Sequence, residues 1–218
     1  MAARHPRRPR GRPPTRSRQE IVDAAIEVGM RNLSMAAVAA HLGVPVTSLY
    51  SYVDGIEDLE RAAADELLGP LRVTDGPDLP ARDVAIRTGL ALYECVAANA
   101  GLADLYLTSW WRALLAFEEA FASALARRGL REAEAVWLTD AVVTATMGAI
   151  IQHEAWQSAA EVPHSARADQ RTTRRGMSAI GPIDGLQAMT FTLRVLVEGT
   201  LAEFAAGRHP WETADQPS

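Results

Sequence analysis

Residues 34–59, SMAAVAAHLGVPVTSLYSYVDGIEDL, decide the fold. Ser34 is suited to cap a helix, and Gly43 supplies the positive φ that a tight turn requires. Pro45 suits the first position of a following helix, where a missing N–H costs nothing. Three apolar residues lie at the spacing of one buried helical face: Val38, Ala39 and Leu42. The pattern predicts two short helices joined by a tight turn, the layout of a helix-turn-helix that places its second helix in the DNA major groove.

Further helices are predicted on both sides of this stretch. The S-x-x-E sequence at 17–20 has the form of a capping box and opens a helix that residues 29–33 end. Its predicted buried face is Ile21, Ala24, Ala25 and Val28. Residues 54–57 resemble a second capping box that starts a helix ending at Gly69-Pro70. In the helix between them, Leu49 and Val53 are the predicted internal anchors.

The rest of the chain also reads as helix, so the predicted fold is all-α. Residues 72–80 are rich in turn formers and mark a domain boundary. Helices are expected near 81–98, 101–108, 110–128, 131–157 and 184–206, and 158–183 is expected to be a long polar loop. The predicted domains are an arm at 1–16, a DNA-binding unit at 17–69, a helical ligand-binding and dimerisation domain at 80–207, and a tail at 208–218.

Composition narrows the class of protein. The chain has 218 residues, 48% of them apolar and 22% charged, as in soluble globular proteins. Its 22 basic residues are all Arg, which indicates a GC-rich bacterial genome. The single cysteine, Cys95, excludes an internal disulfide and fits the cytoplasm. The sequence has no CxxC or HExxH motif, and charges interrupt the long helices. We therefore expect no metal, no cofactor, no enzyme activity and no membrane span.

The charge is distributed unevenly along the chain. Residues 1–18 contain seven Arg and no acid, whereas residues 19–218 contain 15 Arg and 27 acids. A basic arm on an acidic body indicates a chain whose end binds a polyanion. The alternative is a tail without function.

The residues of the N-terminal unit resemble those of the TetR family of bacterial transcriptional repressors. The matching elements are Val38-Ala39, Leu42-Gly43-Val44, Leu49-Tyr50 and Leu59 after an acidic cap. The resemblance covers about residues 17–68. It implies a three-helix DNA-binding unit, a variable helical domain that holds an inducer, and a two-fold dimer.

Several residues are predicted to contact DNA. Pro45, Val46, Thr47 and Ser48 lie on the N-terminal turn of the second helix, where such modules read bases. Tyr50, Tyr52 and the amides capped by Ser34 are candidates for phosphate contacts. The alternative for both tyrosines is a place in the core.

Base readout and phosphate affinity from the folded unit look weak. The family often has Lys where Ile56 stands and Phe where Val53 stands, and some relatives have an Arg where this chain has Ala36. The arm offers compensation, because Arg10-Gly11-Arg12-Pro13 resembles an AT-hook core that places two Arg in a narrow minor groove.

Deletion of residues 1–14 is expected to weaken DNA binding several-fold or more. It should also flatten the salt dependence, since each lost phosphate contact removes about 0.9 from the log–log slope. Titrations at two or more salt concentrations measure that slope, and an unchanged slope would contradict a role for the arm.

The helical domain is predicted to hold a small apolar or aromatic inducer. The candidate ligand-binding residues are Tyr93, Trp110, Trp111, Phe117, Met147, His153 and Trp156, with Gln152 and Glu154 as further polar groups. The alternative is that the aromatic residues are core and that His153 has a structural role.

The homodimer is predicted to form through the helices near 131–157 and 184–206. The small residues expected there are Ala141, Ala145, Gly148 and Ala149, facing Leu186, Met189, Leu193, Leu196 and Thr200. The alternative is that both stripes pack within one subunit. The predicted function is that of a repressor released from a palindromic DNA operator by a small molecule. An activator, or a DNA-binding helical protein without a switch, remains open.

Overall fold

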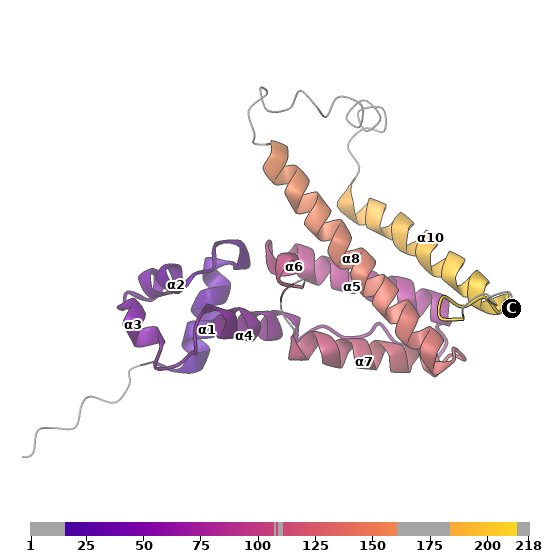
Figure 1. Ribbon diagram of the computed structural model, residues 1–218, viewed down its shortest axis with the longest axis horizontal. Helices are drawn as coiled ribbons and strands as arrows, with labels where there is room; N and C mark the ends of the chain where they lie inside the picture. Colours follow the sequence, from indigo (N-terminus) through magenta and orange to yellow (C-terminus); the bar gives the residue numbers. More distant parts are fainter. Residues whose placement is uncertain (1–15, 107, 109–110, 161–183, 213–218) are drawn as a thin grey trace, which may run out of the picture.

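The computed structural model describes residues 16–106, 108, 111–160 and 184–212, and this part of the chain is helical without strands. Five short elements come first: α1 (Arg18–Val28), the 3-10 turn η1 (Met30–Asn32), α2 (Met35–Leu42), α3 (Val46–Leu49) and α4 (Ile56–Leu68). Longer helices follow: α5 (Ala81–Ala97), the short α6 (Leu102–Leu105), α7 (Arg112–Ala126), α8 (Glu132–Ala160) and α10 (Gly185–Ala205). The all-α prediction is confirmed (Figure 1).

Local capping chemistry explains where α1 and α2 begin. The Glu20 N–H donates to Ser17 Oγ at 3.2 Å, and the Ser17 N–H donates to the Glu20 carboxylate at 2.6 Å, so the capping box is complete. The Ala37 N–H donates to Ser34 Oγ at 3.1 Å. Gly43 ends α2 in the left-handed region, with φ of 65°. The predicted helix-turn-helix geometry therefore rests on the residues that suggested it.

Two predicted helix starts differ in detail. Pro45 precedes α3 as its cap, with extended backbone, and does not occupy the first helical position. Gly55, not Asp54, caps α4 and offers no side chain to do so. The expected box between Asp54 and Glu57 does not form among the described contacts; instead the Asp54 N–H donates to the Asp58 carboxylate at 3.1 Å.

The N-terminal unit has its own small core. Ile21 and Ala25 of α1 are fully buried, as are Val38 of α2 and Leu59 of α4. Leu49, the single buried residue of α3, fixes that helix to the core, so the other side chains of α3 are left for another molecule.

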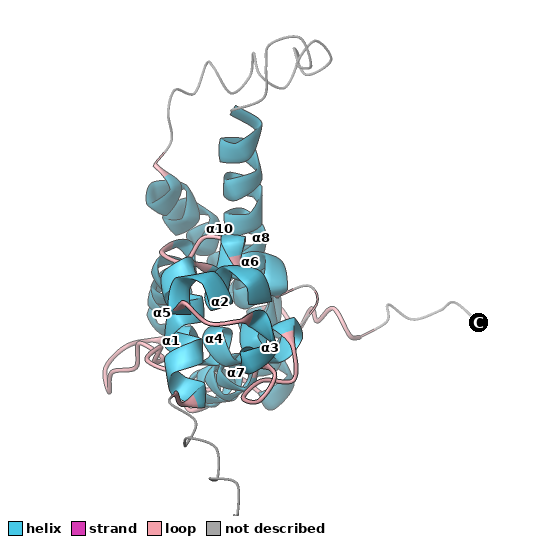
Figure 2. Ribbon diagram, turned by 90° about the vertical axis from the view of Figure 1, so that its left-hand side faces the viewer, coloured by secondary structure: helices cyan, strands magenta, loops and turns pink. Residues whose placement is uncertain are grey.

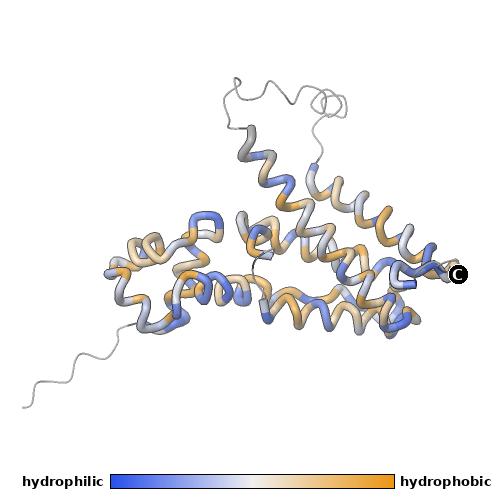
Figure 3. Tube along the Cα trace, in the orientation of Figure 1, coloured by the Kyte–Doolittle hydropathy of each residue, from blue (hydrophilic) through white to orange (hydrophobic). Residues whose placement is uncertain are grey.

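The C-terminal helices form a bundle around α5 and α8. Gly89 of α5 allows α8 and α10 to approach closely, because a Cβ at this position would lie 2.8 Å from both Leu193 and Val142. Apolar residues recur along α7, α8 and α10 (Figure 3). Helix α8 continues to Ala160, so residues 158–160 are helical and the predicted loop begins later; residues 161–183 lie outside the described part.

One segment of the described residues, Glu132–Ala155 of α8, is long and apolar enough to cross a membrane by length and composition alone. Half of its most apolar window is buried inside the protein, where α8 packs against α5, α7 and α10. Packing in the bundle therefore accounts for its apolar composition.

Candidate DNA-binding surface and the contacts behind it

Helix α3 lies at the end of the molecule opposite the C-terminal bundle (Figures 1 and 2). The predicted base-contacting residues Pro45, Val46, Thr47 and Ser48 are all exposed. Tyr50 is 58% exposed, so it does not belong to the core. Tyr52 is half-buried and packs against the core, as its alternative interpretation proposed. The surface thus offers two methyl-bearing side chains, two aliphatic hydroxyls and one phenol.

The folded unit around this surface is acidic. Residues 16–68 contain four Arg and nine acids. Arg18 forms an ion pair with Asp58 at 2.8 Å, and Arg16 donates to the carbonyl of Leu42 at 2.8 Å. Few cations therefore remain for phosphates in this unit. Arg10 and Arg12 of the predicted arm lie outside the described residues.

A link of four residues joins the DNA-binding unit to the bundle. The Arg31 guanidinium of η1 contacts the Glu154 carboxylate of α8 at 2.6 Å. The same carboxylate accepts the Gly101 N–H at 3.1 Å, and the Arg31 N–H donates to the carbonyl of Ala100 at 3.0 Å. Gly101 has φ of 88°, and a Cβ there would lie 2.7 Å from the Arg31 backbone nitrogen.

This link was not predicted from the sequence. Glu154 was a candidate polar group of the ligand pocket, and Arg31 was not singled out. The two residues are 123 positions apart, so no local spacing relates them. The only available signal was Gly101, a glycine at the start of a short helix. A glycine does not indicate which residue packs against it.

A second junction lies between α4 and the bundle. The Asp65 carboxylate of α4 accepts the Ala113 N–H, in the first turn of α7, at 2.8 Å. The Cys95 thiol of α5 lies 3.6 Å from the carbonyl of Leu67, and burial raises the pKa of this thiol. A thiol held protonated is a poor nucleophile, so Cys95 has a packing role here.

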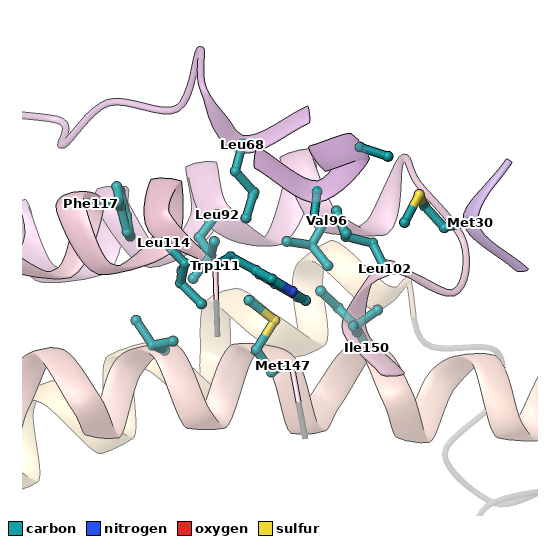
Figure 4. Packing of buried hydrophobic residues seen from close by; sticks show 14 of the residues in the cluster. Met30, Leu68, Leu92, Val96, Leu102, Trp111, Leu114, Phe117, Met147 and Ile150 are labelled. Carbon is teal, nitrogen blue, oxygen red and sulfur yellow. The ribbon is translucent and has the colours of Figure 1, made fainter. Parts of the chain in front are cut away.

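Three predicted ligand residues lie in the tightly packed core. Trp111 is fully buried against Met147 of α8, with Leu92, Val96 and Ile150 around it (Figure 4). Phe117 is buried beside Phe121, with ring centroids 6.0 Å apart. The Trp111 indole N–H is buried and has no hydrogen-bond partner among the described residues, which is costly in an apolar core. Trp110 and the side chain of Trp156 lie outside the described part.

Tyr93 and His153 form a separate group at the start of α10. A Cβ on Gly185 would lie 2.5 Å from the Tyr93 hydroxyl oxygen and 3.9 Å from His153 Cε1. Burial raises the pKa of Tyr93, and the charge of Asp184 raises it further. The His153 ring lies 2.8 Å from the amide nitrogen of Gln157 and is exposed. The structure therefore divides the predicted ligand residues between the core and the α10 end.

Part of the predicted dimer stripe on α10 faces inward, although Leu186 is 37% exposed and Leu196 is half-buried. Met189, Leu193 and Thr200 are buried within the subunit, which agrees with the alternative that this stripe packs inside one chain. The outward face carries other apolar residues, since Phe191 is 70% exposed and Val195 is 57% exposed.

Helices α8 and α10 also carry exposed glycines. A Cβ at Gly148 or Gly199 would have no atom of another described element within 4 Å. This outer surface of α8 and α10 combines exposed apolar side chains with room for close helix approach.

Within the described ranges, no group of three or more His, Cys, Asp or Glu residues is arranged to hold a metal ion.

The exposed hydroxyls of α3, the acidic unit around them and the junctions to a helical bundle define a class of protein. It is an all-α protein with an N-terminal helix-turn-helix and a separate C-terminal helical domain.

Comparison with solved structures identifies this fold more specifically. A possible TetR family transcriptional regulator from Streptomyces coelicolor A3(2) superposes with a TM-score of 0.73 at 19% identity, over 85% of this chain and 99% of that one. ActR from Streptomyces coelicolor in complex with actinorhodin gives 0.69 at 18%, over 86% and 96%. TetR-Q116A from Acinetobacter baumannii AYE in complex with minocycline gives 0.68 at 19%, over 94% and 100%. The chain has the fold of TetR-family regulators, so the resemblance is confirmed in the fold.

Sequence comparison gives one curated relative. The HTH-type transcriptional repressor DrrR1 of Streptomyces coeruleorubidus is 38% identical over 96 residues, which cover 40% of this chain. The match spans about a third of the length of that relative, 36%. No protein-family profile matches the chain.

Proposed function

We propose that this protein is a sequence-specific DNA-binding transcriptional regulator of the TetR type, and most specifically a bacterial cytoplasmic repressor. The single observation that carries the proposal is the exposed α3 surface, anchored to the core by Leu49 alone. Its fold and its 38% identity to a repressor over 96 residues support the same class. Repression of a particular gene depends on operator position, so an activator of this fold is the alternative.

Base reading is assigned to the first turn of α3. Val46 and the Thr47 methyl group are suited to contact thymine methyl groups, and the Thr47 and Ser48 hydroxyls can bond to bases or phosphates. Tyr50 is suited to donate to a phosphate, as are the amides at the start of α2 behind Ser34. Arg10 and Arg12 of the arm are proposed to supply the cations that the acidic folded unit lacks.

Two copies of the chain are needed to read an operator. A single short helix contacts too few bases, and two copies about 34–36 Å apart would match a palindrome. We assign the dimer contact to the outer surface of α8 and α10, around Phe191 and Val195, because these side chains are apolar and exposed.

A small apolar or aromatic inducer is proposed to act through the bundle. The Trp111 N–H, which no described residue accepts, offers a donor inside an apolar core, and Met147 beside it is an adaptable neighbour. Relatives of this fold have been crystallised with actinorhodin and with minocycline. An inducer can shift the DNA-binding equilibrium only through its different affinity for the two states. A compound that raises the melting temperature would support the switch.

Thr47→Ala is expected to weaken binding to the operator about tenfold or more, since a base contact is worth roughly 1–3 kcal/mol. Binding to unrelated DNA should be unchanged, because that affinity comes from phosphates. Tyr50→Phe should instead weaken both by a similar factor. Anisotropy titrations with operator and scrambled duplexes distinguish the two effects. Thr108→Ala, at an exposed threonine of the bundle, is the matched control. Equal operator affinity in Thr47→Ala and the control would remove α3 from the reading surface.

A further inference from the structure

Arg16 carries a positive charge that no carboxylate of the described residues neutralises. Of the other Arg residues in the DNA-binding unit, Arg18 and Arg31 are each paired with a carboxylate, and Arg61 lies within α4. Arg16 forms no ion pair within the described ranges. Its guanidinium donates instead to the carbonyl of Leu42 at 2.8 Å. A carbonyl accepts this hydrogen bond without cancelling the charge, so Arg16 remains a full cation.

The contact with Leu42 places this cation at the helix-turn-helix. Leu42 is the last residue of α2, and Gly43 directly after it makes the turn toward α3. The C-terminal end of a helix carries partial negative charge, which stabilises a cation held there. In such modules the first helix crosses the phosphate backbone while the second lies in the major groove. The guanidinium at the end of α2 is therefore on the side of the unit that meets a DNA strand.

The Arg16 side chain is also oriented before any DNA is bound. It is half-buried, and its contact ties the start of α1 to the end of α2, 26 positions away. A guanidinium has five N–H donors in a fixed fork, and the contact with Leu42 engages only the Nη2 group. The other donors can bind phosphate oxygens with little further loss of side-chain freedom.

We propose that Arg16 binds a backbone phosphate of the operator beside the major groove, and that the Leu42 carbonyl orients it for this contact. The inference rests on the proposed function, because it requires α3 to enter the groove. It makes the folded unit a source of phosphate affinity in addition to the arm. The contact reaches the backbone and not the bases, so it strengthens binding to every DNA sequence alike.

A change of charge at Arg16 tests the contact. Arg16→Gln in the full-length protein should weaken binding to operator and scrambled duplexes by the same factor, roughly five- to tenfold at about 0.1 M salt. It should also reduce the log–log salt slope by about 0.9, the contribution of one phosphate. Arg16→Lys should keep the slope, because lysine retains the charge and also binds phosphate.

The matched control is Arg87→Gln, which removes the same charge from an exposed position on α5 in the bundle. It should change neither the affinity nor the slope. If Arg16→Gln keeps the slope of the unaltered protein, while circular dichroism shows it folded, the proposal is wrong.

The same substitution in a protein without residues 1–14 separates Arg16 from the arm. A direct phosphate contact predicts the same fold loss of affinity with and without the arm. A loss that disappears when the arm is absent would mean that Arg16 only orients the arm, and would contradict the proposal. The proposed function is judged separately, by the ratio of operator to scrambled affinity in the unaltered protein, since a phosphate contact affects both duplexes equally.

Discussion

Phe191→Asp is expected to convert the proposed dimer to a monomer and to abolish sequence-specific DNA binding. Phe191 is the most exposed large apolar side chain of the described residues, at 70%. In a two-fold dimer each copy would bury this charge opposite the same apolar surface. An uncompensated buried charge costs roughly 3–5 kcal/mol, so the dimer dissociation constant should rise about 100-fold or more. Analytical ultracentrifugation measures that change.

A matched control separates the interface from a general effect of added charge. Val136→Asp replaces another exposed apolar residue, 55% exposed, on the α7-facing side of α8. This variant should remain dimeric and should bind operator with unchanged affinity. If Phe191→Asp also remains a dimer, the outer surface of α10 is not the interface.

Gly101→Ala is expected to cost about 3 kcal/mol in the free energy of unfolding. Two causes add: a non-glycine residue in the left-handed region costs roughly 1–2 kcal/mol, and overpacking costs roughly 1–3 kcal/mol. The overpacking arises because the new Cβ would lie 2.7 Å from the Arg31 nitrogen and 2.8 Å from its Cα. These are backbone atoms, so relief requires η1 to move away from the bundle. Urea unfolding measures the loss.

Gly129→Ala provides the comparison. Gly129 has nearly the same φ, 92° against 88°, but a Cβ there would meet nothing within 4 Å. Gly129→Ala should therefore lower the free energy of unfolding only by the conformational cost, about 1–2 kcal/mol. Hydrogen exchange should also be faster near η1 in Gly101→Ala alone. Equal losses of stability in the two variants would mean that the junction tolerates the methyl group.

The contacts at the junction couple the position of the DNA-binding unit to the packing of the helical bundle. Glu154 lies near the end of α8 and holds both Arg31 and Gly101, and Asp65 of α4 holds the start of α7. Any change in the position of α8 or α7 therefore acts directly on η1 and α4. In the proposed dimer, the spacing of the two α3 helices would depend on these same elements, so we expect a ligand that favours another bundle packing to change DNA affinity.

Local signals in the sequence predicted the DNA-binding unit well. Ser17, Ser34 and Gly43 act through hydrogen bonds or backbone conformation within four residues, and such features are visible in the sequence alone. The errors at Pro45 and Gly55 were shifts of one residue at helix starts. The internal anchors Leu49 and Val53 were correct: both are buried, Leu49 at the end of α3 and Val53 four residues after it.

Tertiary contacts could not be predicted in the same way. Three residues of the predicted dimer stripe on α10, Met189, Leu193 and Thr200, are buried within the subunit. Leu193 packs closely against Gly89 of α5, and no local spacing reveals such a contact. Trp111 and His153 were grouped in one pocket, yet the fold separates them. The pairing of Arg31 with Glu154 spans 123 positions and has no periodic signature.

The most direct test of the account is a fluorescence anisotropy titration of the purified protein. The DNA flanking its own gene is compared with a scrambled duplex of the same length, at two salt concentrations. The account predicts binding to the native DNA that is about 10³-fold tighter or more at the higher salt. Equal and steeply salt-dependent binding to both duplexes would contradict it, because phosphate contacts alone would then account for the affinity.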